Sequence, residues 1–289
     1  LGGPIRANSL FFFANYEGIR STSSKTYTSN TMTEMARQGI LPSSSGVRVL
    51  SVAPQVKPYL DLYPLPNGRD LGDGTAEYQS EVATRLREDL ATGRMDYTLS
   101  EKMRVFGRYT FDNGESSTSD PFLIWTFPSS SRYQFFQADG QYQPSAKTIH
   151  SFRLGFSRIR NADTTSVRSD IPDSLSFIPG QSLGAIDITG ITSLGGLRAR
   201  LSPRQFVVND YQFNHEAVYI IEAHTLRFGF GFDRIQFNQR TDDNPIGRYS
   251  FSSLSNFLEG KTDFGDMMLP GSDSIRGWRQ SLFSAFIQD

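Results

Sequence analysis

The chain has 289 residues, enough for one large β domain or two ordinary domains. Its formal net charge of -1 and its lack of a basic tract suited to phosphate tracking argue against nucleic acid as a partner. The absence of cysteine excludes disulfides and thiolate metal sites, and no apolar run approaches the roughly 18 residues that a membrane-spanning helix needs. Aromatic residues make up 13% of the chain, so its apolar surface is concentrated in large rings.

Eight segments are predicted to form strands, most of them with alternating apolar and polar side chains. Successive side chains of a strand point to opposite faces, so alternation gives each face its own chemistry. Each segment is close to the roughly 9–11 residues that a tilted strand needs to cross a bilayer. In chain order, the predicted strands lie near residues 9–18, 85–98, 103–113, 131–142, 148–160, 206–220, 225–239 and 279–289.

Three of the connections between these strands share one pattern. The tetrapeptides LSEK, PSAK and IEAH are the right size for tight hairpin turns. Around each turn a tyrosine is followed five residues later by a basic side chain, in the pairs Tyr97–Lys102, Tyr142–Lys147 and Tyr219–His224. We interpret the three as copies of one hairpin end. The tyrosines would then belong to an aromatic girdle at the lipid headgroups.

The connections at the other ends of the strands are predicted to be long, polar loops. They cover residues 19–84, 114–130, 161–205 and 240–278, and short helices are expected within 52–66 and 250–260. Compact soluble domains mostly use connections of about 4–6 residues, so four such loops on one side argue against an ordinary sandwich. Tight turns at one rim and long loops at the other are typical of outer-membrane barrels.

The predicted fold is therefore all-β: a transmembrane antiparallel up-and-down β-barrel, partial and of about eight strands, with long extracellular loops. The alternative is a soluble all-β domain whose aromatic side chains fill an interior. In the barrel, one group of arginines would point into the lumen, toward a plug or a polar solute or toward carboxylates such as Asp112 and Asp233. These are Arg104, Arg108, Arg153 and Arg227.

Six segments occur in the order expected for one known family. They are LGGPIRANSLFFFANYEGIR (1–20), LYPLPN (62–67), MDYTLSEKMRVFGRYTF (95–111), HTLRFGFGFDRIQFNQR (224–240), YSFSSLSNFLEG (249–260) and RQSLFSAFIQD (279–289). Together they resemble the Oar-like TonB-dependent receptors, bacterial outer-membrane proteins with a carboxypeptidase-regulatory-like N-terminal domain. No single segment is diagnostic, but the set covers most of the chain.

The resemblance implies a barrel of about 22 strands with a plug in its lumen. Residues 1–289 would be an internal fragment from the N-terminal part of that barrel, without the plug or the TonB box, and no signal peptide is visible at Leu1. The implied setting is the bacterial cell outer membrane, with membrane lipid and a TonB-type energy-transducing protein as partners. The latter would act through the missing plug.

We expect the whole protein to take up a large polar solute, peptide or oligosaccharide. The alternative is an adhesion or structural barrel that binds partners through its loops without transport. Near the outer rim, aromatic and cationic side chains are candidates to contact ligand, although they equally suit loop packing or the girdle. These residues are Trp125, Phe127, Arg132 and Tyr133.

Enzyme motifs are weak in this sequence. The stretch GQSLG places Ser182 in a Gly-x-Ser-x-Gly pattern, which leaves a secreted hydrolase as a third hypothesis, but a nucleophile elbow needs a strand before the serine and a helix after it. The stretch TDDN at 241–244 has oxygen ligands suited to calcium, yet acidic loop clusters are usually only solvated. We expect no catalytic residue, no cofactor and no metal site.

Overall fold

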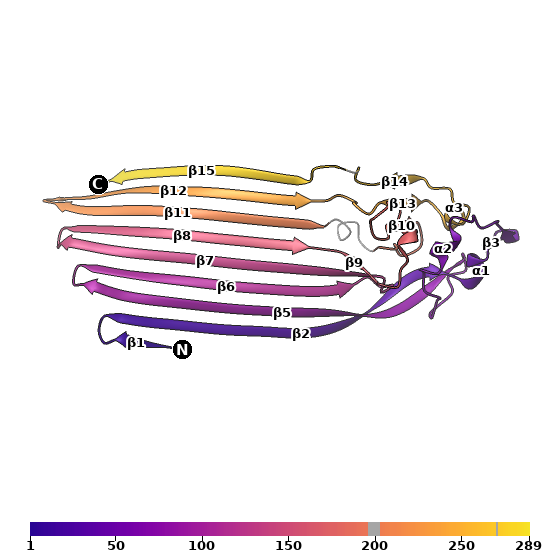
Figure 1. Cartoon of the computed structure of the whole chain (residues 1–289), viewed down its shortest axis with the longest axis horizontal. Helices are drawn as coiled ribbons and strands as arrows, with labels where there is room; N and C mark the ends of the chain where they lie inside the picture. The colour runs from indigo at the N-terminus through magenta and orange to yellow at the C-terminus, as the bar shows by residue number, and fades with distance from the viewer. Residues whose placement is uncertain (196–202, 270) are drawn as a thin grey trace.

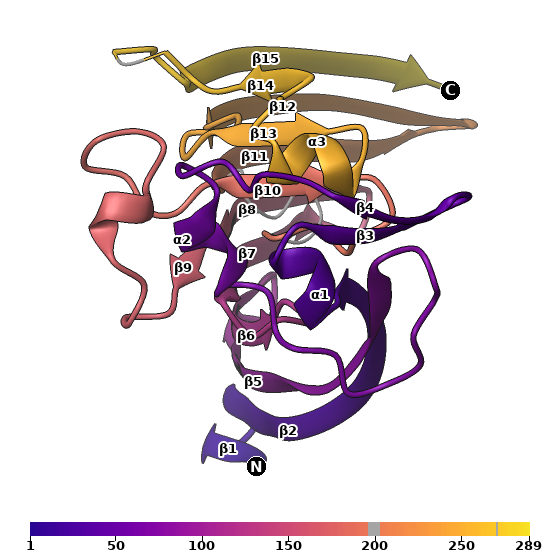
Figure 2. The same ribbon diagram turned by 90° about the vertical axis from the view of Figure 1, so that its right-hand side faces the viewer.

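The computed structural model describes residues 1–195, 203–269 and 271–289. One antiparallel sheet dominates the molecule, and each long strand pairs with its neighbours along the chain (Figure 1). The sheet is curved and open, with β1 and β15 at its two edges (Figure 2). Its strands, in spatial order, are β1 (Gly2–Arg6), β2 (Leu10–Met32), β5 (Thr75–Ser100), β6 (Met103–Ser119), β7 (Trp125–Ser145), β8 (Thr148–Asp163), β11 (Arg204–Ile221), β12 (His224–Thr241) and β15 (Ile275–Gln288), and β9 (Ser166–Val167) adds to β7.

All eight predicted strands are present, and several are much longer than predicted. Strands β2 and β5 have 23 and 26 residues, and β2 pairs with β5 along its whole length. Their extensions are rich in serine, threonine and charged residues, so apolar alternation marks only the part that suits a membrane. The short strand β1, which was not predicted, pairs with the start of β2 through a turn in which Asn8 has φ 60°.

The three tight turns are confirmed, and two of them use the same local hydrogen bond. Ser100 Oγ accepts from the Lys102 backbone N–H at 3.2 Å, and Ser145 Oγ accepts from the Lys147 N–H at 3.2 Å. In the third turn Glu222 takes the left-handed conformation, with φ 54°. The serine in LSEK and in PSAK is therefore the turn-forming residue, because its hydroxyl can bond to the backbone two residues on.

The predicted long loop at 114–130 is wrong, because β6 and β7 run into it from both sides. The connection is only residues 120–124, and the buried side chain of Asp120 organises it. Its carboxylate accepts backbone N–H bonds from Phe122, Ile124 and Trp125 at 3.0, 2.8 and 2.6 Å. Burial raises the pKa of Asp120, and these N–H donors oppose the rise.

The described parts of the three remaining long connections fold together into one small body, here called the extracellular cap, at the end of the sheet opposite the tight turns (Figure 1). It holds both expected short helices: α2 lies within 52–66, and α3 follows the N-cap Ser253 and ends before Gly260, which has φ 69°. The elements of the cap are α1 (Glu34–Arg37), β3 (Ile40–Ser43), β4 (Gly46–Val49), α2 (Lys57–Leu60), η1 (Asp173–Leu175), β10 (Ala185–Ile188), β13 (Arg248–Phe251), α3 (Leu254–Leu258) and β14 (Phe264–Asp266).

The hydrophobic core of the described chain lies in the cap and at the strand ends that meet it, and not along the faces of the long sheet. Its largest fully buried side chains include Trp125, Tyr63, Phe257 and Met32. Tyr63 packs edge-to-face against Phe257 at 6.0 Å between ring centroids. The sequence predicted polar loops, and this core was not foreseen, because its members come from segments far apart in the chain.

The apolar side chains of the long strands stay uncovered. Leu154 is 51% exposed and Phe283 is 70% exposed, and no second layer of described residues packs on them. A soluble all-β domain would bury such groups inside itself, so the arrangement fits a sheet whose apolar face meets lipid. Among the described residues no helix is long and apolar enough to cross a membrane.

Candidate functional site

The strand register assigns every side chain of the long sheet to one of two faces. Directly paired residues share a face, so one cross-strand row can be followed through Gly107, Ala138, Leu154, Phe213, Phe232 and Phe283. We call this apolar side the outer face. The next row toward the cap, Tyr109, Phe136, Phe156 and Tyr211, is aromatic.

Four such rows follow one another on the outer face, from the row of Met103 and Tyr142 to that of Tyr109 and Phe136. They are apolar apart from His150, His215, Arg234 and Ser281. Each row is two residues further along the strand, so the four span roughly 20 Å before strand tilt. This is comparable with the apolar band of about 25 Å on membrane barrels. Beside the tight turns, the girdle tyrosines Tyr97, Tyr142 and Tyr219 all fall on this face.

The opposite side, here called the lumenal face, is polar and carries all four arginines predicted to point inward. Arg153 Nε donates to Asp139 Oδ1 at 2.9 Å, and Arg227 Nη2 donates to Glu216 Oε1 at 2.5 Å. The partners are therefore carboxylates of the adjacent strands. The expected pairing with Asp112 or Asp233 is not seen for these two arginines.

The other two predicted arginines form no ion pair within the described part of the chain. Arg108 Nη2 donates to Gln137 Oε1 at 3.3 Å. Arg104 lines a cavity of about 440 Å³ together with Asp96, Asp139 and Arg153. Because the arginine side chains are largely exposed, each ion pair on this face contributes only about 0–1 kcal/mol and can exchange its partner for a solute.

Glycines hollow the lumenal face next to these ion pairs. A Cβ on Gly229 would stand 2.3 Å from Phe286 Cε1, and one on Gly231 would stand 2.5 Å from Ser284 Oγ. Phe286, which breaks the alternation of the last strand, thus lies across Gly229 and closes one side of a cavity of about 270 Å³. Its polar lining comes from Asp139, Ser151, Arg153, Asn214, Glu216 and Ser284.

The candidate ligand residues near the rim do not form one cluster. Trp125 is fully buried and Phe127 is nearly so, both within the core of the cap, which makes them packing residues, the alternative role left open for them. Arg132 and Tyr133 are consecutive on β7 and so point to opposite faces. Tyr133 donates to Asn161 Oδ1 at 3.3 Å on the lumenal face, whereas Arg132 lies on the outer face.

Sequence reasoning missed Asp96, Asp139, Glu216 and Phe286, which complete the lumenal cavities. A signal for them was available. Once the tight turns fix the register, each of these residues falls opposite a lumenal position of the neighbouring strand. The lumenal face as a whole offers guanidinium, carboxylate, amide and hydroxyl groups at short range, which suits a polar solute better than an apolar one.

The structure around GQSLG and TDDN does not support a catalytic serine or a metal site there. Ser182 is followed by β10 and not by a helix, so the turn of a nucleophile elbow is not formed there. In TDDN, Asp242 pairs with Arg240 at 2.8 Å and Asn244 bonds to Asp266. Within the described residues, no group of three or more His, Cys, Asp or Glu side chains is placed to hold a metal ion.

Comparison with known proteins supplies the family. No curated protein matches the chain significantly. One solved structure, the outer membrane transporter YddB from Escherichia coli, resembles the whole of this chain at 14% sequence identity with a TM-score of 0.48. The match covers 31% of that transporter, so this chain spans about a third of its length. The model of the outer membrane beta barrel domain family matches residues 1–289, and the chain therefore belongs to this family of bacterial outer-membrane proteins.

Proposed function

We propose that this chain is part of the barrel wall of a TonB-dependent receptor of the Oar-like type, which imports a large polar solute. The observation that carries the proposal is the lumenal face, where exposed ion pairs surround cavities hollowed by Gly229 and Gly231. The family resemblance of the six sequence segments supports the same reading. An Arg–carboxylate pair that is open to water can release either partner to a solute carboxylate, amide or hydroxyl.

The driving force for import would come from outside these residues. A TonB-type energy-transducing protein would pull on a plug inside the complete barrel, and the lumenal face would hold solute or plug in turn. Arg104 and Arg153 share one cavity, so they are the first residues we assign to solute contact. We propose no catalytic step, cofactor or metal for this chain.

Adhesion is the second candidate, and one observation favours it. The cap has its own core, built around Tyr63, Trp125 and Phe257, which gives the extracellular surface a fixed shape independent of the lumen. A rigid surface of this kind suits binding of a partner without transport. The two functions differ in whether bound solute reaches the inside of the cell envelope.

An uptake assay separates the two functions. Cells carrying the complete receptor would be given a fluorescent peptide mixture and fluorescent oligosaccharides, with and without collapse of the proton-motive force. We expect energy-dependent accumulation of one probe. The double variant Arg104→Gln/Arg153→Gln should reduce it at least tenfold, because a hydrogen bond to a charged group contributes roughly 1.5–3 kcal/mol and about 1.4 kcal/mol corresponds to a factor of ten.

The matched control removes the same charge from the cap, in Arg48→Gln/Arg69→Gln, and should leave uptake unchanged. Both arginines are exposed and pair with Glu259 and Glu77 on the surface. Surface binding that is insensitive to the proton-motive force, with no internal accumulation, would favour adhesion and overturn the transport proposal.

A further inference from the structure

The outer face changes character immediately beyond the aromatic row of Tyr109, Phe136, Phe156 and Tyr211. Toward the cap it becomes strongly basic, although the chain as a whole has a formal charge of -1. Eight arginines fall on this part of the outer face, here called the arginine belt: Arg20, Arg85, Arg87, Arg132, Arg158, Arg160, Arg240, which pairs with Asp242, and Arg279. Two carboxylates, Asp89 and Glu115, lie among them.

Several belt arginines oppose one another directly. Arg132 pairs in register with Arg160, and Arg20 pairs with Arg87. Like charges placed directly opposite on neighbouring strands are destabilising. Arg20 and Arg87 share Asp89 between them. Within the described residues, by contrast, no carboxylate forms an ion pair with Arg132 or Arg160, so these two guanidiniums remain available to an anion from outside the chain.

Neutral groups orient two of the belt guanidiniums, those of Arg132 and Arg158. Arg132 Nη2 donates to Asn113 Oδ1 at 2.8 Å, with its guanidinium 5.5 Å from the centroid of the Phe111 ring. Arg158 Nη1 donates to Asn209 Oδ1 at 3.0 Å. Each of these contacts uses one edge of the guanidinium and leaves further N–H groups for another acceptor. The guanidiniums are thus oriented without being neutralised.

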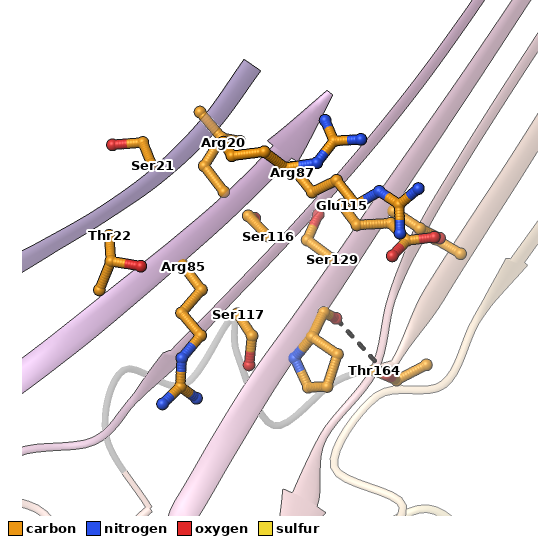
Figure 3. A pocket seen from close by; sticks show the side chains of 14 residues that line it. Arg20, Ser21, Thr22, Arg85, Arg87, Glu115, Ser116, Ser117, Ser129 and Thr164 are labelled. Atoms are coloured by element: carbon orange, nitrogen blue, oxygen red, sulfur yellow. Dashed lines mark hydrogen bonds between the residues drawn. The ribbon is translucent and has the colours of Figure 1, made fainter. Parts of the chain in front are cut away.

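A groove at the β2 and β5 end of the belt has the size of a headgroup. Its volume is about 570 Å³, and Arg20, Arg85 and Arg87 line it with Thr22, Ser117 and Ser130 and with one carboxylate, Glu115. Figure 3 shows Arg20 and Arg87 side by side on neighbouring strands, with Arg85 extending away from them. Three guanidiniums with hydroxyl groups between them form a set of donors suited to phosphate oxygens.

We propose that the arginine belt binds the phosphate groups of lipids in the outer leaflet of the membrane. The location selects this partner: the belt adjoins the last apolar row, at the height where acyl chains give way to headgroups. A lipid seated there would place its chains against Phe136 and Phe156 and its phosphate among the guanidiniums. At the same height, the lumenal face carries Asp112, Asp163 and Asp210. The excess of arginine is therefore a feature of the outer face and not of this whole part of the sheet.

The test measures binding of a defined phosphorylated lipid to the complete protein in neutral detergent. Diphosphoryl lipid A and its dephosphorylated form are the two probes, with bound lipid counted by native mass spectrometry. We expect the unaltered protein to bind the phosphorylated form at least tenfold more tightly, and the difference to shrink as salt rises from 0.05 to 0.5 M because these charges are exposed. Inorganic phosphate at equal concentration should not displace the lipid.

Variants locate the site. Arg132→Gln/Arg158→Gln/Arg160→Gln should lose tenfold or more in affinity for diphosphoryl lipid A. The control Arg48→Gln/Arg69→Gln/Arg168→Gln, which removes the same charge from the cap, should retain it. Equal binding of both lipid forms by the unaltered protein, a measurement that needs no variant, would overturn the proposal, as would displacement by free phosphate or equal loss in belt and cap variants. Failure here leaves the transport proposal untouched, because that concerns the lumenal face.

Discussion

Replacement of Phe257 by alanine is expected to unfold the extracellular cap while the long sheet stays paired. The Phe257 side chain is 1% exposed and packs edge-to-face against Phe251 at 5.1 Å and Tyr63 at 6.0 Å. Truncation of a fully buried phenylalanine costs about 3–5 kcal/mol. The cap is a small body with a modest core, so this loss is a large part of its free energy of unfolding.

Limited proteolysis of the membrane-inserted protein measures the effect. In the Phe257→Ala variant, cleavage should move into residues 33–74 and 242–274, while the strands remain protected by their ladders and by lipid. The matched control is Phe264→Ala, in the same cap, where the ring is 51% exposed and little packing is lost. Equal protection of the two variants would show that the cap has no cooperative core of its own.

Introducing arginine at Leu154 is expected to be the most damaging change on the long sheet. Leu154 lies on the outer face in the third of the four apolar rows, with Ala138 and Phe213 beside it. A lipid-facing arginine near the bilayer midplane costs about 2–4 kcal/mol, and the cost falls toward the interfaces. The same strand offers a control on its other face: Ser157→Arg would place the charge on the lumenal side, opposite Asp210.

Refolding into lipid vesicles followed by urea titration measures this difference. The complete protein with Leu154→Arg should show a lower folded fraction and a free energy of unfolding reduced by about 2–4 kcal/mol, whereas Ser157→Arg should stay within about 0.5 kcal/mol of the unaltered protein. If the two substitutions are equally harmful, the assignment of the faces is wrong.

The membrane part of the fold could be predicted from local rules. Alternation identified the strands, and the tetrapeptides LSEK and PSAK identified turns that Ser100 and Ser145 close through their hydroxyls. The full lengths of β2 and β5 could not be found this way. The cap-side parts of these two strands, near 19–32 and 75–84, have few apolar side chains that could alternate with polar ones. They are strands because they pair with each other.

The packed core of the cap could not be predicted from the sequence, for a different physical reason. Its core joins the strand-end residues Met32 and Trp125 with Tyr63, Leu194 and Phe257 from three different connections, and these meet only after the sheet has brought the strand ends together. No local period links such residues. The same non-local packing buries Trp125, which the sequence had suggested as a candidate ligand contact.

Only part of the candidate site could be predicted from the sequence. The lumenal arginines follow from alternation alone, but their partners Asp139 and Glu216 depend on register. Arg132 and Tyr133 were grouped because they are adjacent in sequence, whereas adjacency in a strand separates side chains to opposite faces. That separation is what places Arg132 in the arginine belt.

The central claim is that the apolar side of the sheet meets lipid, and a single-cysteine scan of residues 151–157 tests it most directly. Because the sequence contains no cysteine, only the introduced thiol can react. The complete protein in vesicles would be treated with a small water-soluble thiol reagent. We expect modification with a period of two: reaction at Ser151, Arg153, Gly155 and Ser157, and protection at Phe152, Leu154 and Phe156. Uniform reaction, or protection of the arginine-bearing side instead, would contradict it.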